Sequence, residues 1–352
     1  MKIAVDKNTI NEVKLNNSYI YLFDDESLEV LLNTGLHCIY YKHCNFVDIN
    51  LTDYNVNCIK KAKTTDKDFD KLPPKKDYKF AIIVPNCNNN HGDYNGKTFL
   101  QNCIESILNQ TYKNFNLIIV DDCSTDTSIK TIEKYKYNPK YVSKIHLIKN
   151  KRKRYNGGSR NVGIEYALDY IEFDYFCFLD SDDWWIDDKV LEKINHRLYN
   201  HELMTLGVQT VHNINEPHHT RLNEAKCYQD LWSLNTNVWC TAWDKVIRKD
   251  KIVYFCEDTL MEDRVWTYRL ADNIDFDNVI NLKEICYVWN RLNTTNSVSQ
   301  VRNYYWDASA YCHIGHQLQL IGQLKHKEMI PIIEKRIEQC KSQVNNGIYA
   351  QD

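Results

Sequence analysis

Short apolar segments alternate with amphipathic ones between residues 80 and 179, and this alternation most constrains the fold. The segments between the apolar runs predict helices over 97–110, about 126–137 and about 159–171, the first with a continuous apolar stripe. Continuous apolar runs are typical of strands buried on both faces; they are FAIIVP (80–85), NLIIV (116–120), KIHLI (144–148) and YFCFL (175–179). Strands that alternate with helices predict an α/β fold, with a mostly parallel sheet and helices on both faces.

The 352-residue chain is long enough for one large domain with an added module, or for two domains. A polar stretch rich in Lys and Asp, 60–79, contains a Pro-Pro pair and predicts a linker. The tail from 303 to 345 has apolar segments that predict helices, which could fold back on the domain or form a homo-oligomer contact. The expected divisions are an N-terminal module with its linker over 1–75, a main domain over 76–300 and a helical tail over 301–352.

Composition excludes several classes of protein. The formal net charge of -3 gives no general attraction to nucleic acid or to an anionic membrane. The 13 cysteines form no CxxC pair and fit a reducing compartment better than a disulfide framework. The N-terminus lacks the charged and apolar regions of a signal peptide. The sequence contains no run of about 18 apolar residues, so we expect no membrane span. We therefore expect a cytoplasmic protein.

Polar residues follow three of the predicted strands. They are VPNCN (84–88), VDDCSTDTS (120–128) and the acidic DSD (180–182). Ligands bind beyond the carboxyl ends of parallel strands, so these segments predict a binding site. No glycine-rich phosphate loop is present, and carboxylates alone repel phosphate. A diphosphate here would need a divalent cation, and ligands that are all oxygen favour Mg²⁺ or Mn²⁺.

Residues 80–185 resemble the nucleotide-sugar half of a family 2 glycosyltransferase, a metal-dependent, inverting family with the Rossmann-like GT-A fold. The resemblance rests on QTYKNFNLIIVDDCSTDTS (110–128), NGGSRNVG (156–163) and the acidic DxD after the fourth strand. Order, spacing and strand context agree over about a hundred residues. The resemblance divides the main domain into a nucleotide-sugar half, 76–185, and an acceptor half, 186–300.

The resemblance implies a donor site for a nucleotide sugar, with a UDP-sugar expected. Pro85 would flank the base, and Asp122 would bind the uracil or the ribose. Asp180 would lie beside the ribose and near the metal, while Asp182 would coordinate the Mn²⁺ or Mg²⁺ ion that holds the diphosphate. Arg160 would help to hold the base or the phosphates.

Further downstream, MEDRVWTYRLA (261–271) resembles the E-D-x-x-[FW] segment of the family, whose Asp is generally the catalytic base. This implies that Asp263 takes the proton of the acceptor hydroxyl, with Glu262 as the fallback. The segment YVWNRLNTTNSVS resembles the one that closes over the donor diphosphate, which gives Arg291 and Ser297 as candidates. WDKVIRKD resembles a segment near the acceptor site.

Some residues have simpler explanations. The DDCSTD segment could cap the helix that starts near 126, because Ser and Asp are favoured there. Asp263 could be a solvated helix residue, and Asp183 could cap the turn after the acidic loop. Two departures from the family lie near the donor and leave base and sugar open: Cys87 replaces a usual Tyr, and the glycine segment is short.

Two other functions remain open. One is nucleotidyl transfer that makes a nucleotide sugar, although this normally needs a glycine-rich loop after the first strand. The other is a non-catalytic protein that binds sugar nucleotides or glycans, and the Glu262–Asp263 pair argues against it. The acceptor could be a glycan, a lipid carrier, a protein or a modified base. A lipid acceptor would require a location at the periphery of a membrane.

Overall fold

The chain divides into two compact units, 1–76 with 193–199 and 77–192 with 200–352. In the first unit β1 (Lys2–Ile3) pairs with β4 (Val47–Asp48), and β2 (Lys14–Leu15) pairs with β3 (Ser18–Tyr19), both antiparallel. Besides these strands, the computed structural model describes residues 77–151, 155–212, 218–223, 225, 241–292 and 304–345. The expected domain boundaries stay predictions.

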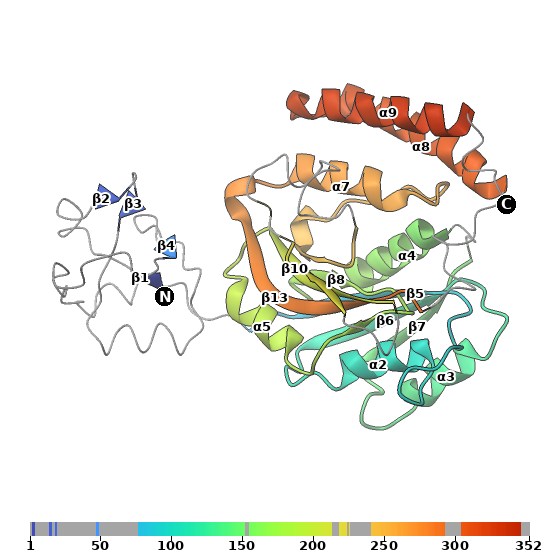
Figure 1. Ribbon diagram of the computed structural model, residues 1–352. Coiled ribbons are helices and arrows are strands. Elements are labelled where there is room, and N and C mark those ends of the chain that lie inside the picture. The colour runs from blue at the N-terminus through green and yellow to red at the C-terminus, as the bar shows by residue number, and fades with distance from the viewer. Residues whose placement is uncertain are drawn as a thin grey trace. The chain divides into compact units, whose positions relative to one another are not determined.

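The second unit is built on a nine-stranded sheet, of which one half is parallel. Neighbouring strands of this half are β7 (Ile145–Lys149), β6 (Phe115–Asp121), β5 (Phe80–Asn86) and β8 (Tyr175–Phe178). All three pairs run parallel, so their carboxyl ends meet at one edge. Helices cover both faces, with α4 (Tyr155–Tyr170) and α7 (Glu262–Asn273) on one side and α2 (Phe99–Leu108) and α3 (Ser128–Lys136) on the other (Figure 1). The predicted α/β class is confirmed.

The sheet becomes mixed beyond β8. β12 is antiparallel to both β8 and β10, whereas β13 is parallel to β10 with register shifts around Gly207. Two short strands, β9 and β11, pair antiparallel with β13 and β10. The bounds are Trp184–Trp185 for β9, Leu203–Val211 for β10, His219–Arg221 for β11, Lys245–Arg248 for β12 and Val279–Asn290 for β13.

The helices follow the predicted periodicity, with bounds set by local chemistry. The helix expected over 97–110 begins after Thr98, because Thr98 and Gln101 form a reciprocal capping box. The helices are α2 (Phe99–Leu108), α3 (Ser128–Lys136), α4 (Tyr155–Tyr170), α5 (Val190–Arg197), α7 (Glu262–Asn273), α8 (Tyr304–Gln323) and α9 (Ile330–Asn345). Short 3-10 turns lie at Lys249–Lys251, Phe276–Asn278 and Lys327–Met329.

Helix α4 begins four residues earlier than the sequence predicts, because the double glycine belongs to its first turn. A Cβ atom on Gly157 would lie 2.1 Å from the carbonyl oxygen of Cys256, so only glycine allows this approach. Further along α4, Gly163 packs closely on Ile83 and Val120 of the sheet. These contacts fix α4 against the sheet. Arg160 lies on α4 between these two glycines, so its position is fixed as well.

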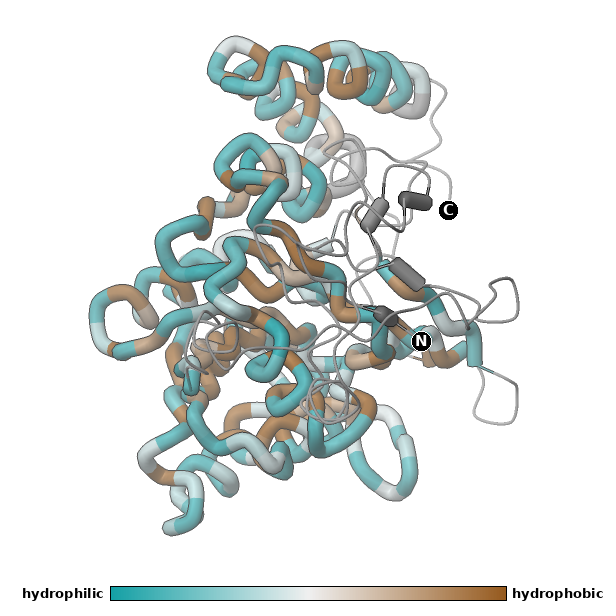
Figure 2. Tube along the Cα trace, turned by 90° about the vertical axis from the view of Figure 1, so that its left-hand side faces the viewer, coloured by the Kyte–Doolittle hydropathy of each residue, from teal (hydrophilic) through white to brown (hydrophobic). Residues whose placement is uncertain are grey.

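The C-terminal segment is helical, as predicted; α8 packs on α7, and α9 packs on α8 (Figure 1). Ser309 of α8 accepts from the backbone N–H of Leu260 at 2.6 Å, and Asp272 of α7 accepts from the N–H groups of Lys325 and His326. Hydrophobic residues gather along the central strands and alternate with hydrophilic ones on the C-terminal helices (Figure 2). Within the described part of the chain, no helix combines the length and apolarity that crossing a bilayer requires.

Candidate active site

The ends of β5 and β6 are held together as their parallel register predicts. Pro85 lies opposite Val120, and the buried Asn86 donates to Asp121 Oδ1 at 3.0 Å. The backbone N–H of Asp122 donates to the carbonyl of Asn86 at 2.7 Å. Pro85 and Asp122 therefore lie at the same edge of the sheet, where the sequence places the nucleotide.

Three consecutive asparagines after β5, Asn88–Asn90, organise this edge, and only Asn88 belongs to a segment that the sequence predicts for the site. Asn88 Oδ1 accepts from the N–H of Thr125 at 2.7 Å. Asn89 donates to Ser181 Oγ at 2.7 Å, which ties the loop to the acidic segment. Asn side chains mimic backbone groups in turns, so a run of them after a strand is a signal that could have indicated this scaffold.

The acidic residues after β6 separate into two environments. Asp122 Oδ1 accepts from Asn150 Nδ2 at 2.9 Å. Asp126 Oδ1 accepts from the N–H of Ser128 at 2.8 Å, at the start of α3. Asp126 therefore bonds a backbone N–H at the start of α3 without being its N-cap residue, while Asp122 is held at the strand end.

The acidic segment after β8 also contains residues of different kinds. Asp183 is buried and accepts from Tyr287 Oη at 2.5 Å and from the N–H of Asn290 at 2.7 Å, so it connects this loop to β13 rather than capping a turn. Burial, followed by the charges of Asp182 and Asp180, raises the pKa of Asp183 well above its usual range. Asp180 and Asp182 are half-buried.

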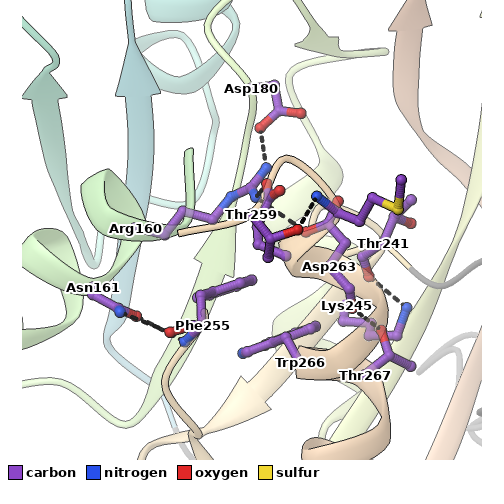
Figure 3. Close-up of polar contacts among 12 residues, drawn as sticks. Arg160, Asn161, Asp180, Thr241, Lys245, Phe255, Thr259, Asp263, Trp266 and Thr267 are labelled. Atoms are coloured by element: carbon purple, nitrogen blue, oxygen red, sulfur yellow. Dashed lines mark hydrogen bonds and ion pairs between the residues drawn. The ribbon is translucent and has the colours of Figure 1, made fainter. Parts of the chain in front are cut away.

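One buried arginine connects the acidic segment to α7. Arg160 of α4 is 1% exposed; its Nη2 lies 2.7 Å from Asp180 Oδ1. Its Nη1 lies 2.6 Å from Glu262 Oε1 and 3.0 Å from Asp263 Oδ1. Figure 3 shows the guanidinium between Asp180 and Asp263, with Phe255 at its side. The structure thus brings together four of the predicted site residues, which we call the Arg160 cluster.

Three carboxylates contact this single cation, and burial raises the pKa of the two on α7. Burial, and then the charge of Asp263, raises the pKa of Glu262 to about 8. Burial also raises the pKa of Asp263 to about 6, although Arg160 opposes the shift. Asp263 is 26% exposed at its side chain and is ionised at neutral pH. A carboxylate of this basicity at a partly open position is suited to accept a proton.

Helix α7 is also close to a buried ion pair on β12. Lys245 Nζ lies 2.6 Å from Asp244 Oδ1, both side chains are fully buried, and the pair influences the pKa of Asp263. Trp243 stacks on Tyr287 with ring centroids 4.4 Å apart. The first residues of the segment that was expected near the acceptor are thus buried, whereas Arg248 and Asp250 form an ion pair at the surface.

The remaining predicted residues lie apart from these contacts or outside the described chain. The guanidinium of Arg291 lies 4.7 Å from the ring centroid of Trp289, and its N–H donates to the carbonyl of Val211 at 2.8 Å. Ser297 lies outside the described residues. The roles of both over a diphosphate stay predictions.

The chemistry of the acidic segment fits a hard divalent cation. Among the described residues, no group of three or more His, Cys, Asp and Glu side chains is placed to hold a metal. Asp180 and Asp182 offer carboxylate oxygens, and one oxygen of Asp180 already accepts from Arg160. Mg²⁺ is often bound through one or two carboxylates together with substrate phosphates and water, and this donor set matches that pattern.

Comparison with known proteins agrees with this architecture. Residues 81–259 match the family described as glycosyl transferase family 2. The crystal structure of residues 1–349 of Staphylococcus aureus TarS has a TM-score of 0.53 at 19% identity, covering 76% of this chain and 74% of that one. The α/β unit therefore has the GT-A fold, and the chain belongs to glycosyl transferase family 2.

Curated relatives match over shorter stretches. A protein of Haemophilus influenzae described as an uncharacterized glycosyltransferase is 40% identical over 114 residues, 32% of this chain and 43% of that protein. The Escherichia coli UDP-Glc:α-D-GlcNAc-diphosphoundecaprenol β-1,3-glucosyltransferase WfaP is 39% identical over 102 residues, 29% of this chain and 37% of that protein. The chain thus spans less than half the length of these relatives.

Proposed function

We propose that this chain is an inverting glycosyltransferase that transfers a sugar from a UDP-sugar to an acceptor hydroxyl, with Asp263 as the base. The observation that carries the proposal is the Arg160 cluster, which joins the acidic segment at the sheet edge to the Glu262–Asp263 pair. A transferase needs its base within reach of the donor sugar, and this cluster supports that arrangement. Membership of the family supports transferase chemistry.

A UDP-sugar is the donor that the relatives favour. WfaP is named for UDP-Glc, and TarS was also crystallised with UDP-GlcNAc (TM-score 0.51, 22% identity, 68% of this chain and 66% of that chain). In this chain Pro85 and Asp122 would contact the base and ribose, and Asp180 would lie beside the ribose. All three lie at the carboxyl ends of strands, the edge where α/β sheets bind their ligands.

In the proposed reaction Asp263 accepts the proton of the acceptor hydroxyl while the hydroxyl oxygen attacks the anomeric carbon. Attack from the face opposite the diphosphate inverts the anomeric centre. Asp182, with Asp180, would hold a Mn²⁺ or Mg²⁺ ion, which when bound stabilises negative charge on the leaving diphosphate. Arg291 and Ser297 would close over that diphosphate.

The acceptor is proposed to be a glycan or lipid-linked hydroxyl. WfaP is named for a diphosphoundecaprenol-linked acceptor. TarS is named as a poly(ribitol-phosphate) β-N-acetylglucosaminyltransferase, and it is 27% identical over 231 residues, 60% of this chain and 36% of that protein. A lipid-linked acceptor would place the enzyme at the periphery of a membrane on its cytoplasmic side.

The test is a panel of UDP-, GDP- and CMP-sugars incubated with the full chain and Mn²⁺. We expect release of UDP from one UDP-sugar, which increases when the correct acceptor is added and disappears in Asp263→Asn. Release of pyrophosphate from a nucleoside triphosphate and a sugar phosphate would instead identify a nucleotidyltransferase. Binding of a UDP-sugar without any release under all conditions would contradict the catalytic proposal.

A further inference from the structure

Helices α7, α8 and α9 enclose polar groups within an apolar junction. The apolar part belongs to the main core and includes Trp266, Ile314, Ile333 and Ile337. On α8, Ser309, His313 and Gln317 follow one another at four-residue spacing, so they lie on one face. Ser309 binds the backbone at the start of α7, which directs this face toward α7.

Two of these polar side chains have unsatisfied hydrogen-bonding groups. His313 and Gln317 are both 0% exposed. Within the described part of the chain, neither ring nitrogen of His313 and neither amide atom of Gln317 has a hydrogen-bond partner. A polar group that is buried without a hydrogen-bond partner destabilises the folded state, so a partner for these groups is expected.

Two arginines add uncompensated positive charge at the same junction. Arg264 of α7 has a buried Nη1, and Arg336 of α9 has a buried Nε, without a hydrogen-bond partner among the described residues. Arg336 Nη1 donates to the neutral amide of Gln339 at 3.3 Å, and no described carboxylate forms an ion pair with either arginine. Both arginine residues are only half-buried as a whole, so part of each side chain reaches solvent while these nitrogen atoms stay buried.

The two arginines are close enough to His313 and Cys340 for their charges to affect the pKa values of both side chains. Burial, followed by the charges of Arg264 and Arg336, lowers the pKa of His313 to about 3. The same two arginines act on the thiol of Cys340, on α9, whose pKa burial raises. Residues from three helices therefore converge, and two cations lie beside a neutral imidazole.

We propose that this α7–α8–α9 junction binds a small oxyanion of the phosphate or sulfate class, held by Arg264 and Arg336, with His313 and Gln317 as further donors. Water could satisfy an imidazole or an amide, but it does not neutralise two guanidinium groups. An oxyanion supplies several acceptors and the opposite charge, and guanidinium groups bind its paired oxygens in a bidentate way. The proposal is independent of the proposed glycosyl transfer.

The experiment measures thermal unfolding of the full chain while sodium phosphate or sulfate is titrated against sodium chloride of equal ionic strength. A specific anion raises the Tm in a saturable way, because only the folded state binds it. Arg264→Gln and Arg336→Gln are expected to raise the half-saturating concentration about 10-fold or more, since each removes a charged donor. Lys335→Gln is the matched control, because it removes the same charge from an exposed position of α9.

These anions also stabilise many proteins by exclusion from the surface, without saturation. An equal, unsaturated rise in the wild type and all three variants would therefore overturn the proposal. If Arg264→Gln does not fold, Arg336→Gln and isothermal titration of the wild type with phosphate still test the site. Absence of binding heat at millimolar phosphate would refute the proposed site. Methyl phosphate separates two sources of the anion: equal affinity indicates a phosphate ester of a larger ligand, and weaker binding indicates free phosphate.

Discussion

Arg160 Nη1 lies 3.0 Å from Asp263 Oδ1, although 103 positions separate the two residues in the chain. The same guanidinium reaches Asp180 at 2.7 Å through Nη2. One planar guanidinium therefore contacts both the acidic segment and the proposed base.

Replacing Asp263 with Asn should abolish most transfer while donor binding is retained. The amide has nearly the same shape but cannot accept the acceptor proton, and general base catalysis contributes about 10²–10⁴-fold. The measurement is kcat for UDP release, together with the Kd for UDP from calorimetry. Asp277→Asn, the same chemical change at an exposed position, should leave both values unchanged. Normal turnover in Asp263→Asn would exclude this residue as the base.

Activity should depend on pH with an acidic limb near pH 6. The base acts only when ionised, and the pKa of Asp263 is raised from its usual value to about 6. The logarithm of kcat/KM should therefore be flat above this pH and fall by about one unit per pH unit below it. If the acidic limb persisted unchanged in a partly active Asp263 variant, the limb would report the ionisation of another group.

Arg160→Lys should move this acidic limb to higher pH. Arg160 lowers the pKa of Asp263, and a lysine ammonium cannot contact three carboxylates in the bidentate manner of a guanidinium. Because the side chain is buried, complete removal as in Arg160→Met should cost about 3–5 kcal/mol of stability. Arg269→Lys on α7 is the control. A lower stability without any shift of the pH profile would indicate a purely structural arginine.

The sequence was sufficient to predict the fold of the second unit and the sheet edge that carries the site. Buried parallel strands have a distinctive apolar pattern, and their carboxyl ends meet by geometry, so Pro85, Asp122 and Asp180 could be placed near one another. The resemblance named Glu262 and Asp263 as well. Their proximity to Asp180 depends on how α7 packs, and no local pattern encodes that.

Other features depended on tertiary contacts. Arg160 was expected to contact the nucleotide, yet its described partners are three carboxylates of the chain itself. Asp183 was expected to cap the turn after the acidic segment, but it is buried and accepts from Tyr287, which connects it to β13. Both differences have the same cause. The sequence pattern predicts where a side chain lies on its own helix or strand, but its contact partner belongs to an element that is distant in sequence.

Asp182→Asn should weaken metal-dependent donor binding, whereas Asp183→Asn should mainly reduce stability. Asp182 is half-buried at the sheet edge, while Asp183 is buried and bonded to Tyr287 and Asn290. Calorimetry of UDP with and without Mn²⁺ and thermal unfolding separate the two effects. Asp188→Asn, at an exposed position nearby, should change neither. Chelation by EDTA should reduce UDP release by the wild type, and unchanged UDP binding by Asp182→Asn with Mn²⁺ would contradict the role.

Gly157→Ala should destabilise the protein and reduce transfer together. The added methyl group would lie 2.1 Å from the carbonyl oxygen of Cys256, so the first turn of α4 has to move, and overpacking of this kind costs about 1–3 kcal/mol. Arg160 is three residues further along the same helix, so its contacts with Asp180 and Asp263 should loosen.

Gly315→Ala provides the matched comparison for Gly157→Ala. A Cβ atom at Gly315 meets no atom within 4 Å, and the residue is exposed on α8. Alanine there should raise stability by about 0.5–1 kcal/mol, because glycine lowers helix stability by that amount. Thermal unfolding and kcat/KM of both variants check the pair. Equal stability of the two variants, with unchanged activity in Gly157→Ala, would show that close packing at Cys256 does not position Arg160.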